Sequence, residues 1–194
     1  MIAATPSKLH WNYFLALEHD LDQLSRYVEF AEPNYGVYSI ELAHLLFAAS
    51  SEVDVVAKQL CQLSNPNEHP DNINEYRARI LPLLPELPDS EVFVPRYGLS
   101  FKPWSNWAED INPLWWKSYN NVKHQRNVYF NEATLKNALN SLGALLLLTI
   151  HYYSRELADQ PGQILSLKDT TGELLPHSSL LRLAPRFYYD NLVV

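Results

Sequence analysis

A chain of 194 residues with 47% hydrophobic and 19% charged residues has the composition of one globular domain, with or without an appendage. Its formal net charge of -7 excludes a general attraction to nucleic acid or anionic membranes, so a phosphate site must be a local basic patch. The single cysteine, Cys61, excludes an internal disulfide and favours a reducing, cytoplasmic setting. The most apolar run, residues 144–150, is far shorter than the roughly 20 residues that a bilayer needs, so no membrane is expected as a partner.

The first 63 residues predict two amphipathic helices. Thr5 and Pro6 suit the start of the first helix, whose apolar residues recur at intervals of three and four over residues 14–28. Residues 18–20, Glu-His-Asp, lie on different faces of that helix, which indicates surface charge rather than a metal site. The second helix is expected from about Ser39 to Leu63, because one apolar stripe runs through it without a glycine or proline.

The middle of the chain, residues 64–113, predicts a proline-rich insertion between paired helices. It holds eight of the 13 prolines, so no long element can cross it unbroken. A short helix is expected over residues 72–84. A small hairpin is expected over residues 91–104, with Arg96, Tyr97 and Gly98 in its turn.

The last third predicts two more helices and a second hairpin. One helix follows Pro113, and a strongly apolar one starts near Asn131 and continues to Tyr153. After Pro161, a hairpin with a glycine turn is expected, followed by an aromatic tail. The expected fold class is therefore all-α: an antiparallel helical bundle over residues 1–160, with small β-hairpin decorations and a C-terminal hairpin and tail, residues 161–194, packed on it.

The segment WWKSYNNVKHQRN, residues 115–127, carries the candidate site. At about 100° per residue, a core face is expected to hold Trp115, Tyr119, Val122 and Tyr129. A second face aligns the polar groups that can meet a phosphate or a base: Trp116, Asn120, Lys123, His124 and Asn127. Arg126 points roughly 160° away from His124 in an unbroken helix, so the two share a cleft only if the helix ends or bends between them.

Two carboxylates on the second helix are candidate partners. Glu41 and Glu52 lie at the border of its apolar stripe. Glu52 can reach Lys123 or Arg126 on a neighbouring helix. That contact is either an interhelix salt bridge or part of a functional cluster, because a histidine flanked by lysine and arginine can bind an anion or transfer a proton.

The stretches YSIELAHLLFAASSEVDVVAKQLC and WWKSYNNVKHQRNVYFNEATLKNALNSLGALLLL resemble the HEPN superfamily, over about residues 36–155. The Tyr-Asn-x-x-Lys-His-x-Arg stretch is similar to that of uncharacterised bacterial HEPN-like proteins. The resemblance implies a helical bundle, often dimeric, with two long helices around the site. Many members of the family are metal-independent RNA endonucleases of toxin–antitoxin or phage-defence systems, and others are inactive or serve as binding partners.

One departure from the family's pattern argues against the nuclease function and favours a binding function. In the nuclease motif of the family, an arginine is followed by four to six residues and then by a histidine. If Arg126 is that arginine, the histidine should stand at one of three positions, where this chain has Asn131, Glu132 and Ala133. The leading hypothesis is therefore a homodimeric binding module for RNA or another phosphate-bearing ligand, with no cofactor or metal.

The residues that would carry this function are assigned as follows. The ligand would meet Asn120, Asn121, Lys123, His124, Arg126, Asn127 and Glu41. The alternative is an RNA endonuclease in which His124 transfers the proton, Lys123 and Arg126 stabilise the phosphorane and Glu52 orients a partner group. A structural module that binds another protein through aromatic surfaces is the third hypothesis.

Overall fold

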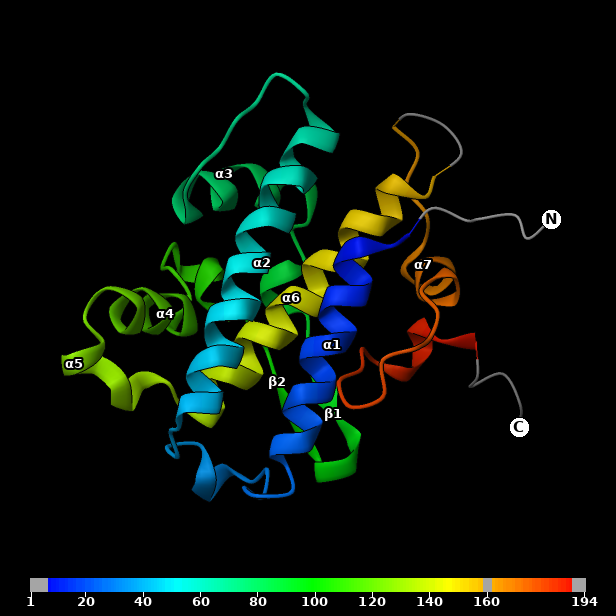
Figure 1. Ribbon diagram of the computed structural model, residues 1–194. Helices are drawn as coiled ribbons and strands as arrows, with labels where there is room; N and C mark the ends of the chain where they lie inside the picture. Colours follow the sequence, from blue (N-terminus) through cyan, green and yellow to red (C-terminus); the bar gives the residue numbers. More distant parts are fainter. Residues whose placement is uncertain (1–6, 159–161, 190–194) are drawn as a thin grey trace.

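The computed structural model describes residues 7–158 and 162–189. These residues form a mainly helical fold with one two-stranded antiparallel sheet, which confirms the helical expectation (Figure 1). The long helices are α1 (Leu9–Leu24), α2 (Ile40–Ser64) and α6 (Leu135–Glu156). The shorter elements are α3 (Ile73–Leu83), α4 (Leu114–His124), α5 (Arg126–Tyr129), α7 (Leu167–Glu173), β1 (Val92–Val94) and β2 (Leu99–Phe101).

Side-chain caps set the starts of the two longest helices. The Ser39 hydroxyl accepts from the backbone N–H of Leu42 at 3.1 Å, as expected for the residue before α2. Thr134, rather than the predicted Asn131, caps α6 by accepting from the N–H of Asn137 at 3.2 Å. The predicted start of the first helix at residues 5 and 6 lies outside the described residues, and α1 begins at Leu9.

The two longest helices, α2 and α6, run parallel to each other, so the expected antiparallel arrangement does not hold for this pair (Figure 1). The segments that precede them are joined, because the N–H of Leu135 donates to the carbonyl of Val37 at 2.8 Å. Helix α1 runs in the opposite direction: His10 in its first turn meets Glu52 and Gln59 in the second half of α2.

Because α2 and α6 begin at the same end, residues 65–134 must carry the chain back between them. This segment contributes large side chains to the main core, including the fully buried Tyr76, Trp104 and Trp107. The hairpin predicted within it is present: β1 pairs with β2, and Gly98 takes the left-handed conformation, φ 63°, in the turn. The proline-rich stretch is therefore part of the packing rather than a peripheral decoration.

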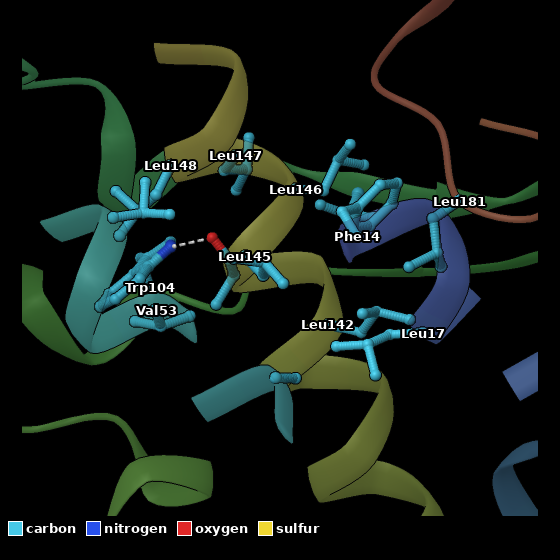
Figure 2. Close-up of a cluster of buried hydrophobic side chains, with 14 of the residues drawn as sticks. Phe14, Leu17, Val53, Trp104, Leu142, Leu145, Leu146, Leu147, Leu148 and Leu181 are labelled. Atoms are coloured by element: carbon cyan, nitrogen blue, oxygen red, sulfur yellow. Dashed lines mark hydrogen bonds between the residues drawn. The ribbon is translucent and has the colours of Figure 1, made fainter. Parts of the chain in front are cut away.

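Helix α6 lies at the centre of the molecule. Of its 22 residues, 16 are buried, so it is covered on all sides rather than along one stripe. Figure 2 shows Trp104 and Val53 on one side of α6, and Phe14, Leu17 and Leu181 on the other. Leucines at consecutive positions, Leu145 to Leu148, are all buried because different elements cover each face of the helix.

The C-terminal segment differs from the prediction. Residues 167–173 form helix α7 instead of a hairpin strand and glycine turn, because Ser166 caps the helix by accepting from the N–H of Asp169 at 3.1 Å. The following residues pack on the bundle and place Leu180, Leu181, Leu183 and Tyr188 in the core. No helix within residues 7–158 and 162–189 is long and apolar enough to cross a membrane.

Candidate functional site

The predicted site segment is interrupted at Gln125. Helix α4 ends at His124, where Gln125 leaves the helical region with φ -139° and ψ 53°, and α5 begins directly afterwards at Arg126. A single continuous helix over residues 115–127 is therefore a wrong expectation. The break falls between His124 and Arg126, which removes the constraint that would have pointed these two side chains apart.

The core face of α4 is as predicted, except at one residue. Trp115, Tyr119 and Val122 are buried, and Val122 packs with Ala43 of α2 in a small second cluster. Trp116, expected on the polar face, is also buried and contacts the ring of Tyr119 at 5.4 Å between centroids. The exposed polar face therefore begins after Trp116.

Two aromatic rings bring Lys123 and Arg126 to one place. Phe47 of α2 and Tyr119 of α4 contact each other edge to face, with ring centroids 6.1 Å apart. The Lys123 ammonium donates to the Tyr119 hydroxyl at 3.1 Å, at the edge of a ring whose centroid is 5.2 Å away. The Arg126 guanidinium lies 5.2 Å from the centroid of the Phe47 ring. The Phe47 ring can stabilise this cation by about 0.5–1 kcal/mol at an exposed position.

The surface around these cations has a local positive charge. Residues 114–127 contain three cationic side chains, Lys117, Lys123 and Arg126, and no carboxylate. All three side chains are exposed, as is His124 between the last two. We call Lys117, Lys123, His124 and Arg126 the α4–α5 basic surface. It can attract an anion although the chain as a whole is acidic.

The asparagines of the segment are partly occupied by the protein itself. Asn120 donates to the carbonyl of Trp116 at 2.9 Å, within its own helix. Asn121 donates to the carboxylate of Glu132, at 3.0 and 3.3 Å to its two oxygens. Asn127 is exposed next to Arg126. Of the three, Asn127 alone lies on the open surface, whereas Asn120 and Asn121 are half-buried and only Asn121 connects α4 to the chain that follows α5.

The two predicted carboxylates do not join this surface. Glu52 faces α1, where its Oε1 lies 2.5 Å from Nδ1 of His10. The expected pairing of Glu52 with Lys123 or Arg126 is therefore wrong. Glu41 is exposed in the first turn of α2, 3.7 Å from His44, and lines a groove between α1 and α2.

His10 was missed by the sequence reasoning and forms a second polar cluster. Its Nε2 lies 2.8 Å from Oε1 of Gln59, so both ring nitrogens meet oxygen atoms. The hydrogen bond to Glu52 is the main cause that raises the pKa of His10, and burial opposes it. The signal was present in the sequence: His10 stands four residues before Phe14 on the apolar stripe of α1, where an unpaired polar group would be costly.

Glu18 is a further correction to the sequence analysis. It was expected on the surface, but it is 2% exposed. Its carboxylate accepts from the hydroxyl of Ser178 and from the backbone N–H groups of residues 179–181. Glu18 thus fastens the C-terminal segment to α1 and has no position from which to bind a metal or substrate.

Within residues 7–158 and 162–189, no three His, Cys, Asp or Glu side chains are placed to hold a metal ion.

Comparisons with the models of known protein families, with curated proteins and with solved structures find no match to this chain.

Proposed function

We propose that the chain is a HEPN-like binding module whose α4–α5 basic surface binds RNA or another phosphate-bearing ligand. The observation that carries this proposal is the placement of Lys123 on the hydroxyl of Tyr119 and of Arg126 on the ring of Phe47, two side chains that contact each other. Both cations are exposed to solvent, where they can contact phosphate oxygens. A homodimer that presents two such surfaces is part of the same proposal.

Binding of a labelled single-stranded RNA, measured by fluorescence anisotropy, tests the proposal. The double variant Lys123→Met, Arg126→Met removes two charges but keeps apolar contact with the rings. We expect it to weaken binding and to reduce the slope of log K against log salt by about 1.4, because each phosphate contact on a single strand contributes about 0.7.

The matched control removes two cations elsewhere, with the double variant Arg96→Met, Lys168→Met. Arg96 pairs with Asp22 at 2.7 Å, and Lys168 lies over the Tyr189 ring, both away from α4 and α5. It produces the same change in net charge and should retain the salt slope of the unmodified protein. The proposal fails if the unmodified protein binds no RNA, or if the Lys123/Arg126 variant folds and binds as well as the control.

The endonuclease alternative gains support from the helix break, since His124 and Arg126 are no longer fixed on opposite faces. It would use His124 as general acid or base, with Lys123 and Arg126 beside the phosphorane, and without Glu52, which pairs with His10. Incubation of structured and single-stranded RNA without metal tests it. Cleavage that disappears in His124→Ala supports this alternative, and cleavage that persists in that variant contradicts it.

A further inference from the structure

A polar cavity lies at the start of α6, apart from the α4–α5 basic surface. Its volume is about 360 Å³, within the range of small-molecule sites. Its lining comes from the first turns of α6, the end of β2 and the chain that follows it, the start of α4, and the region of the 3-10 turn Glu32–Asn34. Four separate parts of the sequence therefore line one cavity.

One lysine of the cavity lining is available to an anion. Lys102 and Lys136 supply two ammonium groups, and Glu32 supplies one carboxylate. The ammonium of Lys102 lies 3.1 Å from Asp89, whereas Lys136 has no ion-pair partner in the part of the chain that the structure describes. A single unpaired ammonium matches a monoanion better than a dianion, which would leave a negative charge next to Glu32.

One wall of the cavity is apolar and flat. The half-buried ring of Phe101 rests directly on the backbone of α6 at Gly143, where an added Cβ would lie 2.6 Å from a ring carbon. Leu139 and the ring of Trp115 line the same cavity. This wall can cover the hydrocarbon body of a ligand, and an aromatic ring suits the flat surface.

The remaining wall offers polar groups that the protein leaves available. Ser105 and Asn106 line it with a hydroxyl and an amide, each of which can donate and accept. Asn140 uses its amide nitrogen on the carbonyl of Lys136 at 2.8 Å, which leaves its side-chain oxygen as an acceptor. A ligand hydroxyl could donate to that oxygen and accept from Asn106 or Ser105.

From these three features we propose that the cavity binds a small aromatic monocarboxylate that carries a hydroxyl group. The carboxylate is held by Lys136, the ring lies along Phe101, and the hydroxyl meets Ser105, Asn106 or the side-chain oxygen of Asn140. This site does not depend on the proposed RNA binding, because Lys123 and Arg126 do not line it.

The test uses the full chain and 4-hydroxybenzoate as the probe. Saturation-transfer NMR and thermal unfolding should both report binding, and 4-hydroxybenzamide, its neutral counterpart, should bind at least about tenfold more weakly. Lys136→Met should reduce the affinity for 4-hydroxybenzoate roughly tenfold or more and leave that for 4-hydroxybenzamide unchanged. Lys168→Met removes the same charge on α7 and should change neither affinity.

Each other outcome overturns the proposal. Absence of 4-hydroxybenzoate binding removes the site. Equal losses in Lys136→Met and Lys168→Met would show an effect of net charge rather than of a lysine in the cavity. Phenyl phosphate is included as a second anion, and tighter binding of phenyl phosphate than of 4-hydroxybenzoate contradicts the assignment to monocarboxylates.

Discussion

At the scale of single residues, the contacts of His10 between two helices favour its protonated form. Its Nδ1 and Nε2 can both donate, to Glu52 and Gln59, only when the imidazole is protonated. The side chains of His10 and Glu52 are 12% and 16% exposed, so the pair is largely shielded from solvent. The hydrogen bond to Glu52 raises the pKa of His10 above the usual value of a histidine side chain.

This raised pKa predicts a pH-dependent contribution to the free energy of unfolding. The contribution is fully present below the unfolded pKa of 6.5 and is lost as pH rises through the higher folded pKa. Urea unfolding of the unmodified protein and of His10→Gln, from pH 5.5 to 8.5, should give a stability difference that shrinks as pH rises. Glu52→Gln should produce the same trend, and a difference that is constant with pH would refute the protonated pair.

For His151, we expect the opposite dependence on pH: it should make the protein less stable as the pH falls. Burial lowers its pKa to about 4, with a smaller effect from Arg155, so the folded state holds it neutral. Since the unfolded chain protonates it near pH 6.5, stability should fall by roughly 3 kcal/mol as pH drops from 6.5 to 4, at about 1.36 kcal/mol per tenfold change in proton affinity. His151→Gln should flatten that part of the urea-unfolding profile, while His69→Gln, on the loop before α3, should leave it steep.

At the scale of elements, the contact between the hairpin and α6 depends on Gly143. In an open helix, alanine is favoured over glycine by about 1 kcal/mol. Here an added methyl would meet the Phe101 ring at 2.6 Å, so Gly143→Ala should destabilise the protein in spite of that preference. In a Phe101→Ala background the next contact, Val92, is an ordinary 3.5 Å, and the same change should become stabilising. Chemical unfolding of the four proteins of this cycle measures the reversal, and equal effects in both backgrounds would disprove the clash.

The elements that the sequence predicted are those with strong local signals. The apolar stripe after Ser39 defined α2, and the Arg96–Gly98 turn defined the hairpin. The α7 helix was missed because Gly172 was taken for a turn, although Ser166 and Asp169 have the spacing of a capping box. The break at Gln125 had no local signal, since neither glycine nor proline stands there. It coincides with the packing of Arg126 on Phe47, a tertiary contact that helical periodicity does not report.

At the scale of the whole molecule, the sequence did not predict the relative direction of the helices or where the C-terminal segment packs. Periodicity identified α2 and α6, but their parallel arrangement depends on how residues 65–134 return across the core. For the candidate site, the predicted core face of α4 is present, whereas the partner of Glu52 was wrong because a border carboxylate can face either neighbour. The sequence thus predicted which face of a helix is buried better than it predicted which neighbouring helix packs against that face.

For the same reason, the sequence did not predict that Glu18 attaches the C-terminal segment to α1. Replacing Glu18 tests this attachment directly. Glu18 accepts the N–H groups of Ser179, Leu180 and Leu181 at 3.0, 3.0 and 2.8 Å. Its removal would leave buried donors unpaired, each at a cost of about 1–3 kcal/mol. We therefore expect Glu18→Ala to lower the free energy of unfolding by about 3–5 kcal/mol.

Amide hydrogen exchange locates this effect. In Glu18→Ala, the amides of Leu180 and Leu181 should exchange faster by a larger factor than those in the centre of α6, because the segment loses its attachment before the core opens. Glu29→Ala, at an exposed position beyond the end of α1, removes the same charge and should change stability by less than about 0.5 kcal/mol. Protected Leu180 and Leu181 amides in Glu18→Ala would mean that the buried leucines alone hold the segment, and that the carboxylate only fills a polar gap.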